Sequence, residues 1–361
     1  MGTGHQGRQR EAGLSVTAPA SKRLRIAVVG AGMGSSPHFK SLESLSSAIE
    51  VPWVCARDAA RLATATLPAQ AQKTTRLEDI LEDRSVDAVI VLTPPNTHLE
   101  IVAKAAAAGK HVLVEKPLEV TQEKARQLVE VCAEHQVKLA VMLQHRMSEA
   151  ATTLRKLIGN GELGNLTNAS ASIRWWRPQS YYDEPGRGTL ARDGGGVLMT
   201  QAIHALDLLL SLTGMPESVI AVARTSASHR MECEDTVAAI LLYKNGAIGN
   251  IDATTAAYPG SAERISLSFT QASATLESGE LLVQWMNGKT LRTGSRQTSG
   301  SGAGAMAFSH AAHQAVLLDF VQAIRTGIEP AVSGSSALDV HRLIAAMMES
   351  SRNAGAVSAL A

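Results

Sequence analysis

The first apolar segment of the sequence, Leu24–Val29, runs directly into a turn with the sequence GAGMGS at residues 30–35. A strand that enters a Gly-x-Gly turn at the start of a helix is typical of the first unit of a dinucleotide-binding domain. Gly30 permits the tight turn, and Gly32 lets the backbone approach a pyrophosphate at the N-terminus of the following helix. Ser35 replaces the third glycine of the motif, so the turn alone also fits an ordinary glycine-rich connection. The expected cofactor contacts in this turn are Gly30, Gly32 and Met33.

Apolar, strand-like segments alternate with helical patterns from Leu24 to about Gln144. Strands joined by helices form βαβ units, and near-continuous apolar strands are covered on both faces. Residues 23–146 are therefore expected to form a Rossmann domain, a doubly wound parallel sheet flanked by helices. The expected strands are Leu24–Val29, Val51–Ala56, Asp87–Leu92, His111–Val114 and Lys138–Met142, and the clearest helices are Leu99–Ala108 and Gln122–His135.

The pattern changes after Arg146, where strand-like segments follow one another with short turns. Tyr243–Ala247 contains an Asn-Gly pair and is typical of a hairpin turn. Residues 147–361 are thus expected to form an α+β domain with an open, mostly antiparallel sheet. The expected strands are 166–176, 219–225, 236–243, 247–255, 264–269 and 281–285; the expected helices are 149–158, 197–212, 310–325 and 336–352, with a flexible Gly/Ser-rich loop at 295–304.

Composition narrows the class of partner. Lysine and arginine (34) nearly balance aspartate and glutamate (33), which gives a net charge of +1. That balance argues against nucleic acid or a membrane surface as a partner and favours a small, neutral or mildly charged ligand. The three cysteines are far apart without metal-ligand spacing, so we expect reduced, buried thiols and no metal site.

The N-terminal residues 1–22 are polar and glycine-rich, and we interpret them as a disordered tail. They lack the apolar core of a secretory signal, and no apolar run reaches the length of about 18 residues that a membrane helix needs. Together with the sparse cysteines, these features favour a cytoplasmic protein.

The end of the second expected strand bears on the choice between NAD and NADP. It reads WVCARD at residues 53–58, where an acidic residue usually binds the adenine ribose. If Ala56 takes the acidic position, Arg57 can pair with a 2′-phosphate or stack on adenine, which slightly favours NADP. The alternative is that Arg57 is a solvated charge and Asp58 only caps the next helix.

Two further segments carry a specific likeness. The sequence TPPNTH occupies residues 93–98 after one expected strand, and Glu-Lys-Pro occupies residues 115–117 after the next. With the glycine turn, these segments resemble the glucose–fructose oxidoreductase, inositol dehydrogenase and rhizopine catabolism (Gfo/Idh/MocA) family, over nearly the whole chain after residue 23. The resemblance implies a Rossmann domain followed by an open sheet domain that often pairs subunits, and chemistry on a hydroxyl or ketone of a sugar or cyclitol. It implies cofactor contacts from Thr93, Pro94, Asn96, His98, Glu115 and Lys116.

The resemblance makes Lys116 the catalytic lysine. Hydride transfer from a carbinol carbon requires that the hydroxyl proton be removed. A lysine in a partly dry pocket beside a positively charged nicotinamide has a lowered pKa, so it can act as the base or polarise the carbonyl in the reverse direction. The bond before Pro117 is a candidate for the cis form. Without the flanking motif, Lys116 would be interpreted as a surface lysine at a strand end.

The second half of the site is expected on the helix that follows the glycine run 194–196. Thr200 and His204 lie one turn apart and share a face. In the family, a histidine at this position often donates or accepts the proton, and an aspartate commonly stands four residues before it; here that residue is Thr200, which cannot take up a proton as a carboxylate can. We therefore expect Lys116 and His204 to do the acid–base work, with Thr200 and Gln201 orienting the substrate. A packed interface is the alternative role for His204.

Aromatic and arginine residues gather at the end of the strand expected at 166–176 and just after it. Aromatic faces suit sugar C–H surfaces, and arginines suit carboxylate or phosphate groups. A cluster at a subunit interface is the alternative. His145 and Arg146, at the end of the last parallel strand, either contact substrate or pack at the hinge between domains. The expected substrate contacts of this group are Trp176, Tyr181, Tyr182 and Arg187.

Three classes of function are compatible with these features. The favoured one is an NAD(P)-dependent dehydrogenase or reductase acting on a CH–OH group of a sugar, sugar derivative or cyclic polyol. The alternatives are a redox-neutral sugar-modifying enzyme that borrows and returns hydride, and a non-catalytic dinucleotide-sensing regulator of the same fold. A regulator would not need Lys116 or His204, and both are present. We expect a homodimer or homotetramer that assembles through the C-terminal sheet.

Overall fold

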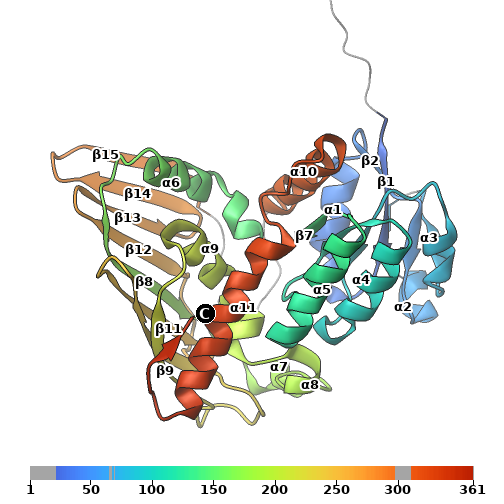
Figure 1. Cartoon of the computed structure of the whole chain (residues 1–361). Helices are drawn as coiled ribbons and strands as arrows, with labels where there is room; N and C mark the ends of the chain where they lie inside the picture. Colours follow the sequence, from blue (N-terminus) through green and yellow to red (C-terminus); the bar gives the residue numbers. More distant parts are fainter. Residues whose placement is uncertain (1–21, 65–66, 69, 297–309, 361) are drawn as a thin grey trace, which may run out of the picture.

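The computed structural model describes residues 22–64, 67–68, 70–296 and 310–360, which form two lobes side by side (Figure 1). The expected disordered tail, apart from Lys22, lies outside the described residues, and so does the expected flexible loop beyond Arg296.

A parallel sheet forms the first lobe. Its strand order is β4-β3-β1-β5-β6-β7 with β2 beside β1, and every pairing is parallel, which confirms the expected doubly wound sheet. The strand order reverses between β1 and β5, so the carboxyl ends of these two strands flank the crevice where such sheets bind dinucleotides. The strands are β1 (Leu24–Val29), β2 (Ile49–Glu50), β3 (Trp53–Cys55), β4 (Gln72–Thr74), β5 (Ala88–Val91), β6 (His111–Val114) and β7 (Leu139–Val141).

Alternate residues of β1 enter two different cores, because successive side chains of a strand point to opposite faces. Ala27 and Val29 pack into the large core that includes α4 and α5, whereas Ile26 and Val28 pack with α1 and α10. Thr121 caps α5 by accepting a hydrogen bond from the Lys124 backbone N–H. The helices of this lobe are α1 (Ser36–Ser44), α2 (Ala59–Thr64), α3 (Glu78–Glu82), α4 (His98–Ala107), α5 (Gln122–Glu134) and α10 (Ala311–Thr326), with the 3₁₀ turns η1 (Met33–Ser35), η2 (Pro95–Thr97) and η3 (Gln144–Met147).

The helix α10 comes from the C-terminal part of the sequence but packs on the first sheet. Its residues Val316, Leu317 and Phe320 are buried in the same core as the β1 face that includes Val28. After α10 the chain runs beside β7, where the Val141 backbone N–H donates to the carbonyl of residue 332 at 3.0 Å. The first lobe therefore contains residues from both sides of residue 146, because α10 packs on its sheet.

The second lobe is a nine-stranded sheet in the order β15-β14-β13-β12-β8-β11-β10-β9-β16. Its pairs are antiparallel except β8 with β11, so the expected mostly antiparallel sheet is confirmed. Tyr243 donates its backbone N–H to the Ala247 carbonyl at 3.1 Å, closing the expected hairpin. The strands are β8 (Leu166–Arg174), β9 (Ser218–Arg224), β10 (Thr236–Leu242), β11 (Ile248–Thr254), β12 (Arg264–Phe269), β13 (Ala272–Glu277), β14 (Glu280–Trp285), β15 (Thr290–Gly294) and β16 (Ser358–Ala359).

Helices cover one face of this sheet, between it and the first lobe (Figure 1). On the other face, Val222, Ile240 and Ile248 are 46%, 45% and 52% exposed. The strand β10 lies between β9 and β11. Ile240 pairs with Ile220, two residues from Val222, and Ile248 pairs with Leu242, two residues from Ile240. The three exposed side chains therefore lie close together. The helical elements of this lobe are α6 (Glu149–Gly159), α7 (Gln179–Tyr182), α8 (Leu190–Asp193), the π-helical turn η4 (Leu198–Ala202), α9 (Ile203–Thr213) and α11 (Gly334–Arg352).

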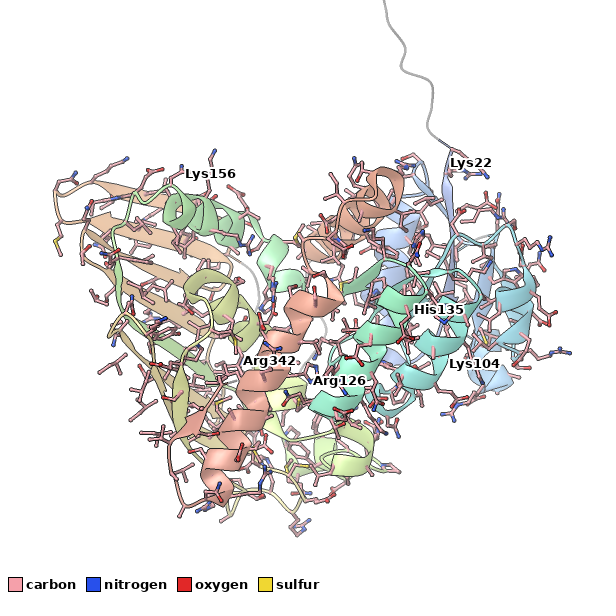
Figure 2. The ribbon with its side chains drawn as sticks, in the orientation of Figure 1. Lys22, Lys104, Arg126, His135, Lys156 and Arg342 are labelled. Carbon is pink, nitrogen blue, oxygen red and sulfur yellow. The ribbon has the colours of Figure 1, made fainter. Side chains whose placement is uncertain are left out.

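One helical stretch, Leu190–Thr213, is apolar and long enough to cross a membrane by composition, but 83% of its most apolar window is buried inside the fold, as in a core helix of a globular protein. The cysteines are free and buried, as expected. Exposed basic side chains such as Lys104, Arg126 and Arg342 are spread over separate helices (Figure 2) and pair with acidic residues one turn away.

Candidate active site

Lys116 lies at the boundary between the lobes, in the turn after β6. Its Nζ donates a hydrogen bond to the Thr200 carbonyl oxygen at 2.9 Å, so the side chain reaches from the first lobe to the second. The Lys116–Pro117 bond is cis. Burial, followed by the charge of Arg187, lowers the pKa of the amine, although Glu115 acts in the opposite direction. The structure thus places a lysine of weakened basicity between the lobes.

Thr200 belongs to the π-helical turn η4, and such turns are frequent at functional sites. The glycine run before it allows close packing. At Gly194, where φ is +76°, an added Cβ would lie 2.5 Å from the Val120 Cα of the first lobe; at Gly196 it would lie 1.7 Å from the Glu234 carbonyl oxygen. Only glycine fits at these two positions, and the close packing sets the Thr200 carbonyl opposite the lysine.

The glycine turn after β1 has the shape that a dinucleotide needs. Gly30 has a φ of +113°, and an added Cβ would lie 2.8 Å from the Leu92 carbonyl carbon, whereas a Cβ at Gly32 would meet nothing within 4 Å. Among the described residues, no side chain caps η1 or α1, and no acidic residue occupies the first turn of either. The backbone N–H groups there can therefore bind an anion, so this segment fits a pyrophosphate. Met33 begins η1, and Arg57 is exposed just after β3, the strand next to β1.

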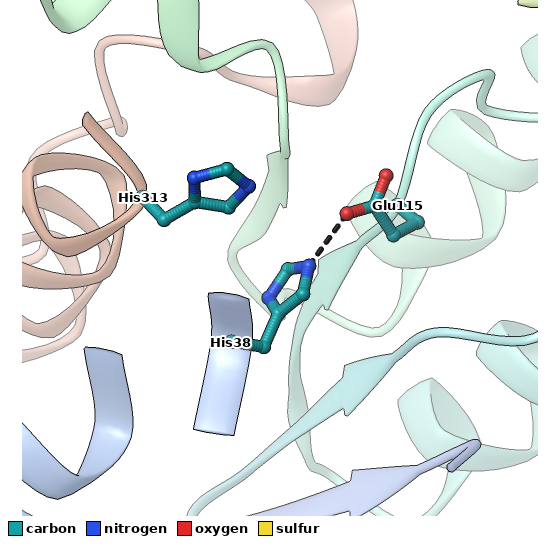
Figure 3. Close-up of side chains that lie close together, drawn as sticks. All are labelled: His38, Glu115 and His313. Carbon is teal, nitrogen blue, oxygen red and sulfur yellow. Dashed lines mark hydrogen bonds and ion pairs between the residues drawn. The ribbon is translucent and has the colours of Figure 1, made fainter. Parts of the chain in front are cut away.

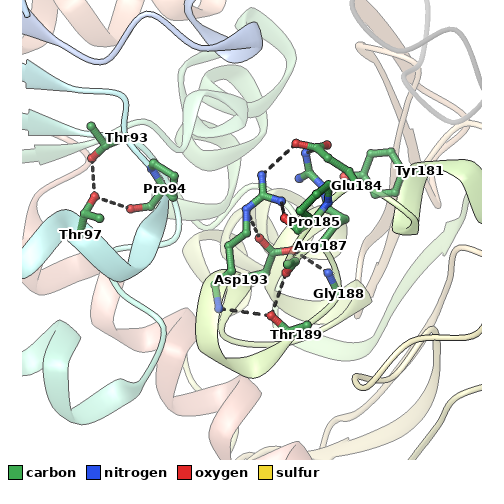
Figure 4. A network of polar contacts seen from close by, with 12 residues as sticks. Thr93, Pro94, Thr97, Tyr181, Glu184, Pro185, Arg187, Gly188, Thr189 and Asp193 are labelled. Carbon is green, nitrogen blue, oxygen red and sulfur yellow. Dashed lines mark hydrogen bonds and ion pairs between the residues drawn. The ribbon is translucent and has the colours of Figure 1, made fainter. Parts of the chain in front are cut away.

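The segment after β5 is held by its own hydrogen bonds. Thr97 Oγ1 donates to Thr93 Oγ1 at 2.8 Å and lies 2.8 Å from the Pro94 carbonyl oxygen (Figure 4). Pro94 and Asn96 are exposed, so both can contact a cofactor that lies over the carboxyl end of the sheet.

The expected cofactor contact from His98 stays a prediction, and the ring lies inside the fold. The ring is fully buried, with Nε2 2.8 Å from the Thr93 carbonyl oxygen and Nδ1 3.1 Å from those of Pro117 and Leu118. Both ring nitrogens therefore contact backbone carbonyl oxygens. Its role is to tie the segment after β5 to the Glu-Lys-Pro turn, which explains why both motifs occur together.

Glu115 lies in a cluster with two buried histidines (Figure 3). His38 Nε2 of α1 lies 2.6 Å from Glu115 Oε1, and the His313 ring of α10 meets the His38 ring edge to face, with centroids 5.2 Å apart. Burial opposes ionisation of Glu115, but His38 and Lys116 outweigh it and lower the carboxyl pKa to about 2. The three possible ligand atoms lie within 4.8 Å of one another, yet 2.6 Å is a hydrogen-bond distance. We interpret the cluster as the anchor of the Glu-Lys-Pro turn.

His204 lies one turn beyond Thr200 and stacks on His145, with ring centroids 4.9 Å apart and planes at 30°. Burial, and next the charge of Lys116, lower the pKa of His204 well below its ordinary value. The ring is therefore neutral near pH 7 and offers one nitrogen as a hydrogen-bond acceptor. The structure brings the two expected acid–base residues close enough for one to shift the pKa of the other.

Four of the expected substrate residues lie together. Gln201 Nε2 donates to Tyr181 Oη at 3.3 Å, and the Arg187 guanidinium lies 4.7 Å from the centroid of the Tyr181 ring. Arg187 is held by an ion pair with Glu184 at 2.9 Å (Figure 4). Thr200 completes the group, since its hydroxyl contacts the Gln201 amide oxygen. This group continues from the Lys116–Thr200 contact along the second lobe.

The expected contact of Tyr182 with substrate stays a prediction, and its side chain packs inward. Its side chain is buried, its hydroxyl lies 2.6 Å from Thr255 Oγ1, and its ring packs on His229 with centroids 4.8 Å apart. Neighbours in sequence thus face different ways, with Tyr181 beside Arg187 and Tyr182 in the core. Trp176 is half-buried against His229 and Tyr258, and its contact with substrate stays a prediction.

Arg146 takes the packing role that the sequence left open, while a substrate contact from His145 stays a prediction. Arg146 forms a two-pronged ion pair with Asp207 of α9, with Nε 2.6 Å from Oδ2, and both side chains are buried. It therefore packs between η3 and α9, whereas His145 turns toward His204.

Three residues of this region were not singled out from the sequence: His38, Glu263 and His313. His38 could have been suspected from its place in the first turn of the helix after the glycine turn. Glu263 lies 3.0 Å from His145, but it precedes a strand of the other lobe and no local pattern marks it. His313 required knowing that α10 packs on the first sheet.

Two family models match the chain: "Oxidoreductase family, NAD-binding Rossmann fold" over residues 24–143 and "GFO/IDH/MocA C-terminal domain" over residues 151–275. An uncharacterised oxidoreductase of Schizosaccharomyces pombe is 33% identical over 61% of this chain and 60% of its own length. The rhizopine catabolism protein MocA of Rhizobium meliloti is 32% identical over 57% of this chain and 62% of its own length. The chain thus spans about three fifths of these relatives.

The fold is shared over a longer stretch with a solved structure. The WlbA dehydrogenase of Bordetella pertussis, in complex with NADH and UDP-GlcNAcA, is 27% identical with a TM-score of 0.80, covering 94% of this chain and 99% of that chain.

Proposed function

The chain belongs to the Gfo/Idh/MocA family of oxidoreductases, and from this premise we propose that it is an NAD(P)-dependent dehydrogenase or reductase. Its substrate class is a sugar, sugar derivative or cyclic polyol, which gains or loses hydride at a hydroxyl-bearing carbon. The observation that carries this proposal is the half-buried Lys116, whose amine is held on the Thr200 carbonyl at 2.9 Å beside a neutral His204. A binding protein has no need to hold two proton-transfer groups of lowered pKa in the crevice.

The chain provides a binding surface for the dinucleotide along the carboxyl ends of its parallel strands. The backbone at Gly30 and Gly32 holds the pyrophosphate, and Arg57 lies where the adenine ribose or its 2′-phosphate would be bound. Further contacts come from the two motif segments, through Thr93, Pro94, Asn96, Glu115 and Lys116. When bound, the nicotinamide supplies hydride acceptance or donation.

The chain's own part in the reaction is proton transfer. In its neutral form, Lys116 donates one N–H to the Thr200 carbonyl and keeps its lone pair for the substrate hydroxyl proton. In the reduction direction the same amine, protonated, donates to the developing alkoxide. His204, whose imidazole is neutral near pH 7, accepts a hydrogen bond from the substrate hydroxyl and orients it toward the amine.

The substrate side is formed by Tyr181, Arg187 and Gln201 of the second lobe. The Tyr181 ring suits a sugar C–H face, and the amide and guanidinium groups suit hydroxyl or anionic substituents. The WlbA dehydrogenase binds UDP-GlcNAcA together with NADH, which supports a sugar-type substrate for a related crevice.

The exposed face of the second sheet is the surface through which we expect two copies to pair. Val222, Ile240 and Ile248 form an apolar group there, and exposed apolar patches of this kind mark interfaces. A homodimer or homotetramer and a cytoplasmic location stay predictions.

The experiment that tests the function has two parts. Binding of NAD⁺ and NADP⁺ is measured by calorimetry on the full chain, and absorbance at 340 nm is followed with a panel of aldoses, sugar acids, cyclitols and nucleotide-linked sugars. Net formation of reduced cofactor with at least one of them is expected. Conversion of a sugar without net cofactor reduction would favour the redox-neutral alternative, and tight binding without any conversion would favour the regulator.

A further inference from the structure

His145 contacts both His204 and Glu263, and these residues come from different parts of the fold. His145 lies in η3, at the carboxyl end of β7, and Glu263 directly precedes β12 of the second sheet. His145 Nδ1 and Glu263 Oε1 are 3.0 Å apart, and the opposite contact of the His145 ring is the stacked ring of His204 at 4.9 Å. The order in space is thus carboxylate, imidazole, imidazole.

The charges of this row differ from one ring to the next. Burial opposes a charge on His145, but the attraction and hydrogen bond of Glu263 outweigh it and raise the pKa of His145, with a smaller contribution from Asp207 and opposition from Lys116. For His204, burial, Lys116, His145 and His313 all lower the pKa. These groups face the pair from η3, α9, α10, the turn after β6 and the residue before β12, and the charge of Asp207 is shared with Arg146 of η3.

We propose that Glu263 and His145 are positioning residues for His204: the carboxylate keeps His145 protonated, and the stacked imidazolium keeps His204 neutral, so that a ring nitrogen stays available as a hydrogen-bond acceptor. The physical reason is that two stacked imidazoles cannot both carry a positive charge without strong repulsion at this separation. Fixing the charge on the outer ring, beside Glu263, therefore excludes it from the inner one. His204 Nδ1 is buried without a hydrogen-bond partner among the described residues. Burial and the nearby charges are therefore the influences that act on the pKa of this ring.

The inference rests on the proposed function for its purpose but not for its test, which follows protonation in the cofactor-free chain. Histidine side chains labelled with ¹³C and ¹⁵N are titrated by NMR, and the signals are assigned with single His→Gln variants. In the wild type, His145 is expected to titrate above the ordinary histidine value of about 6.5, and His204 well below it. If His145 titrates at or below about 6.5 in the wild type, the proposal is wrong, and no variant is needed to show it.

Two variants then test the coupling. Glu263→Gln should release the proton of His145 and raise the pKa of His204 by about one unit or more, because a positive charge next to it disappears. His145→Phe keeps a flat ring on His204 without the charge and should raise that pKa by a similar amount, while Glu263→Asp should restore part of the wild-type behaviour. Glu280→Gln, an exposed glutamate at the start of β14, is the matched control and should change neither titration.

An unchanged pKa of His204 in both Glu263→Gln and His145→Phe would overturn the proposal. The outcomes are separable from those of the proposed function. A chain that turns over no substrate but shows the expected titrations would refute the proposed dehydrogenase function and support the proposed roles of Glu263 and His145. An active enzyme whose histidines titrate at ordinary values would support the function and refute those roles.

Discussion

The ε-amino nitrogen of Lys116 and the carbonyl oxygen of Thr200 lie 2.9 Å apart and form a hydrogen bond that joins the two lobes. The acceptor lies in the π-helical turn η4, and turns of this type are frequent at functional sites. The bond orients the amine and leaves it in a buried environment that lowers its pKa. This one contact makes the relative position of the lobes part of the proposed proton-transfer geometry.

Lys116→Met removes the amine while keeping a side chain of similar length. Hydride transfer should fall by about a hundredfold or more, the usual scale for a lost acid–base group, while dinucleotide affinity stays within a few-fold. In the wild type, oxidation of the alcohol should rise as pH increases through the lowered pKa of the lysine, since the neutral amine is the base; that rise should vanish in the variant. Stopped-flow absorbance gives the rate and calorimetry the affinity, with Lys124→Met on the exposed face of α5 as control. Wild-type turnover in Lys116→Met would remove the lysine from the mechanism.

Arg57→Ala should weaken the binding of NADP more than that of NAD. A charge-assisted hydrogen bond to the 2′-phosphate is lost in one case only, so the preference should change by about tenfold. Dissociation constants for both dinucleotides give the ratio. Arg84→Ala alters an exposed arginine before β5, at the opposite end of the sheet, and should leave the ratio unchanged. Equal losses for the two dinucleotides in Arg57→Ala would refute the preference for NADP.

The neighbours Tyr181 and Tyr182 should respond differently to loss of the hydroxyl. Tyr181→Phe removes the partner of Gln201 and should raise KM for the sugar without changing the free energy of unfolding. Tyr182→Phe leaves the buried Thr255 hydroxyl without its partner and should lower the free energy of unfolding by about 1–2 kcal/mol, with KM unchanged. Urea unfolding and steady-state kinetics on both variants decide. The reverse pattern would place Tyr182 in the pocket after all.

Asp207→Asn should destabilise the chain strongly, because it leaves the buried Arg146 guanidinium without its charged partner. Loss of one partner of a buried ion pair typically costs about 3–5 kcal/mol. Asp339→Asn, in the exposed pair with Arg342, is the control and should cost less than about 1 kcal/mol. Similar unfolding midpoints for the two variants would mean that the Arg146 contact contributes little to stability.

Ile240→Glu should separate the copies of the chain in solution. The residue lies at the centre of the exposed apolar group on the second sheet, and a buried glutamate in an interface would be left unpaired. Sedimentation velocity should show a smaller particle than for the wild type. Ile328→Glu changes an equally apolar residue that is 70% exposed, away from that face, and should leave the assembly intact. A monomeric wild type, or an unchanged assembly in Ile240→Glu, would contradict pairing through this face.

Elements with a regular hydrophobic pattern could be predicted closely. The strands Leu24–Val29, His111–Val114 and Arg264–Phe269 have the bounds expected from the sequence, because each is a short apolar or alternating run next to a turn residue. The strands β2, β4, β13, β15 and β16 were missed. Thr290–Gly294, at the edge of the sheet, has no buried residue and no apolar alternation to mark it.

Site residues were predictable where a local motif carried them. Lys116, Thr200, Gln201, Tyr181 and Arg187 were named from short patterns, and the structure brings them into one region. The burial of His98 and Tyr182 could not be predicted, because a motif shows which residues come together but not which way each side chain points. Both are buried, with their polar atoms bonded inside the protein.

The sequence by itself determined the local structure: a glycine turn after an apolar strand, alternating βα units, a hairpin and strands of alternating pattern in the second half. These elements depend on the backbone preferences of each residue type and on the spacing of apolar residues. Only the tertiary structure decided that α10 returns to the first sheet and brings His313 beside His38, and that Glu263 of the second lobe reaches His145. Those contacts join residues more than a hundred positions apart, and no local pattern records them. Their electrostatic effect, and hence the protonation states proposed for the site, depends on how the lobes pack.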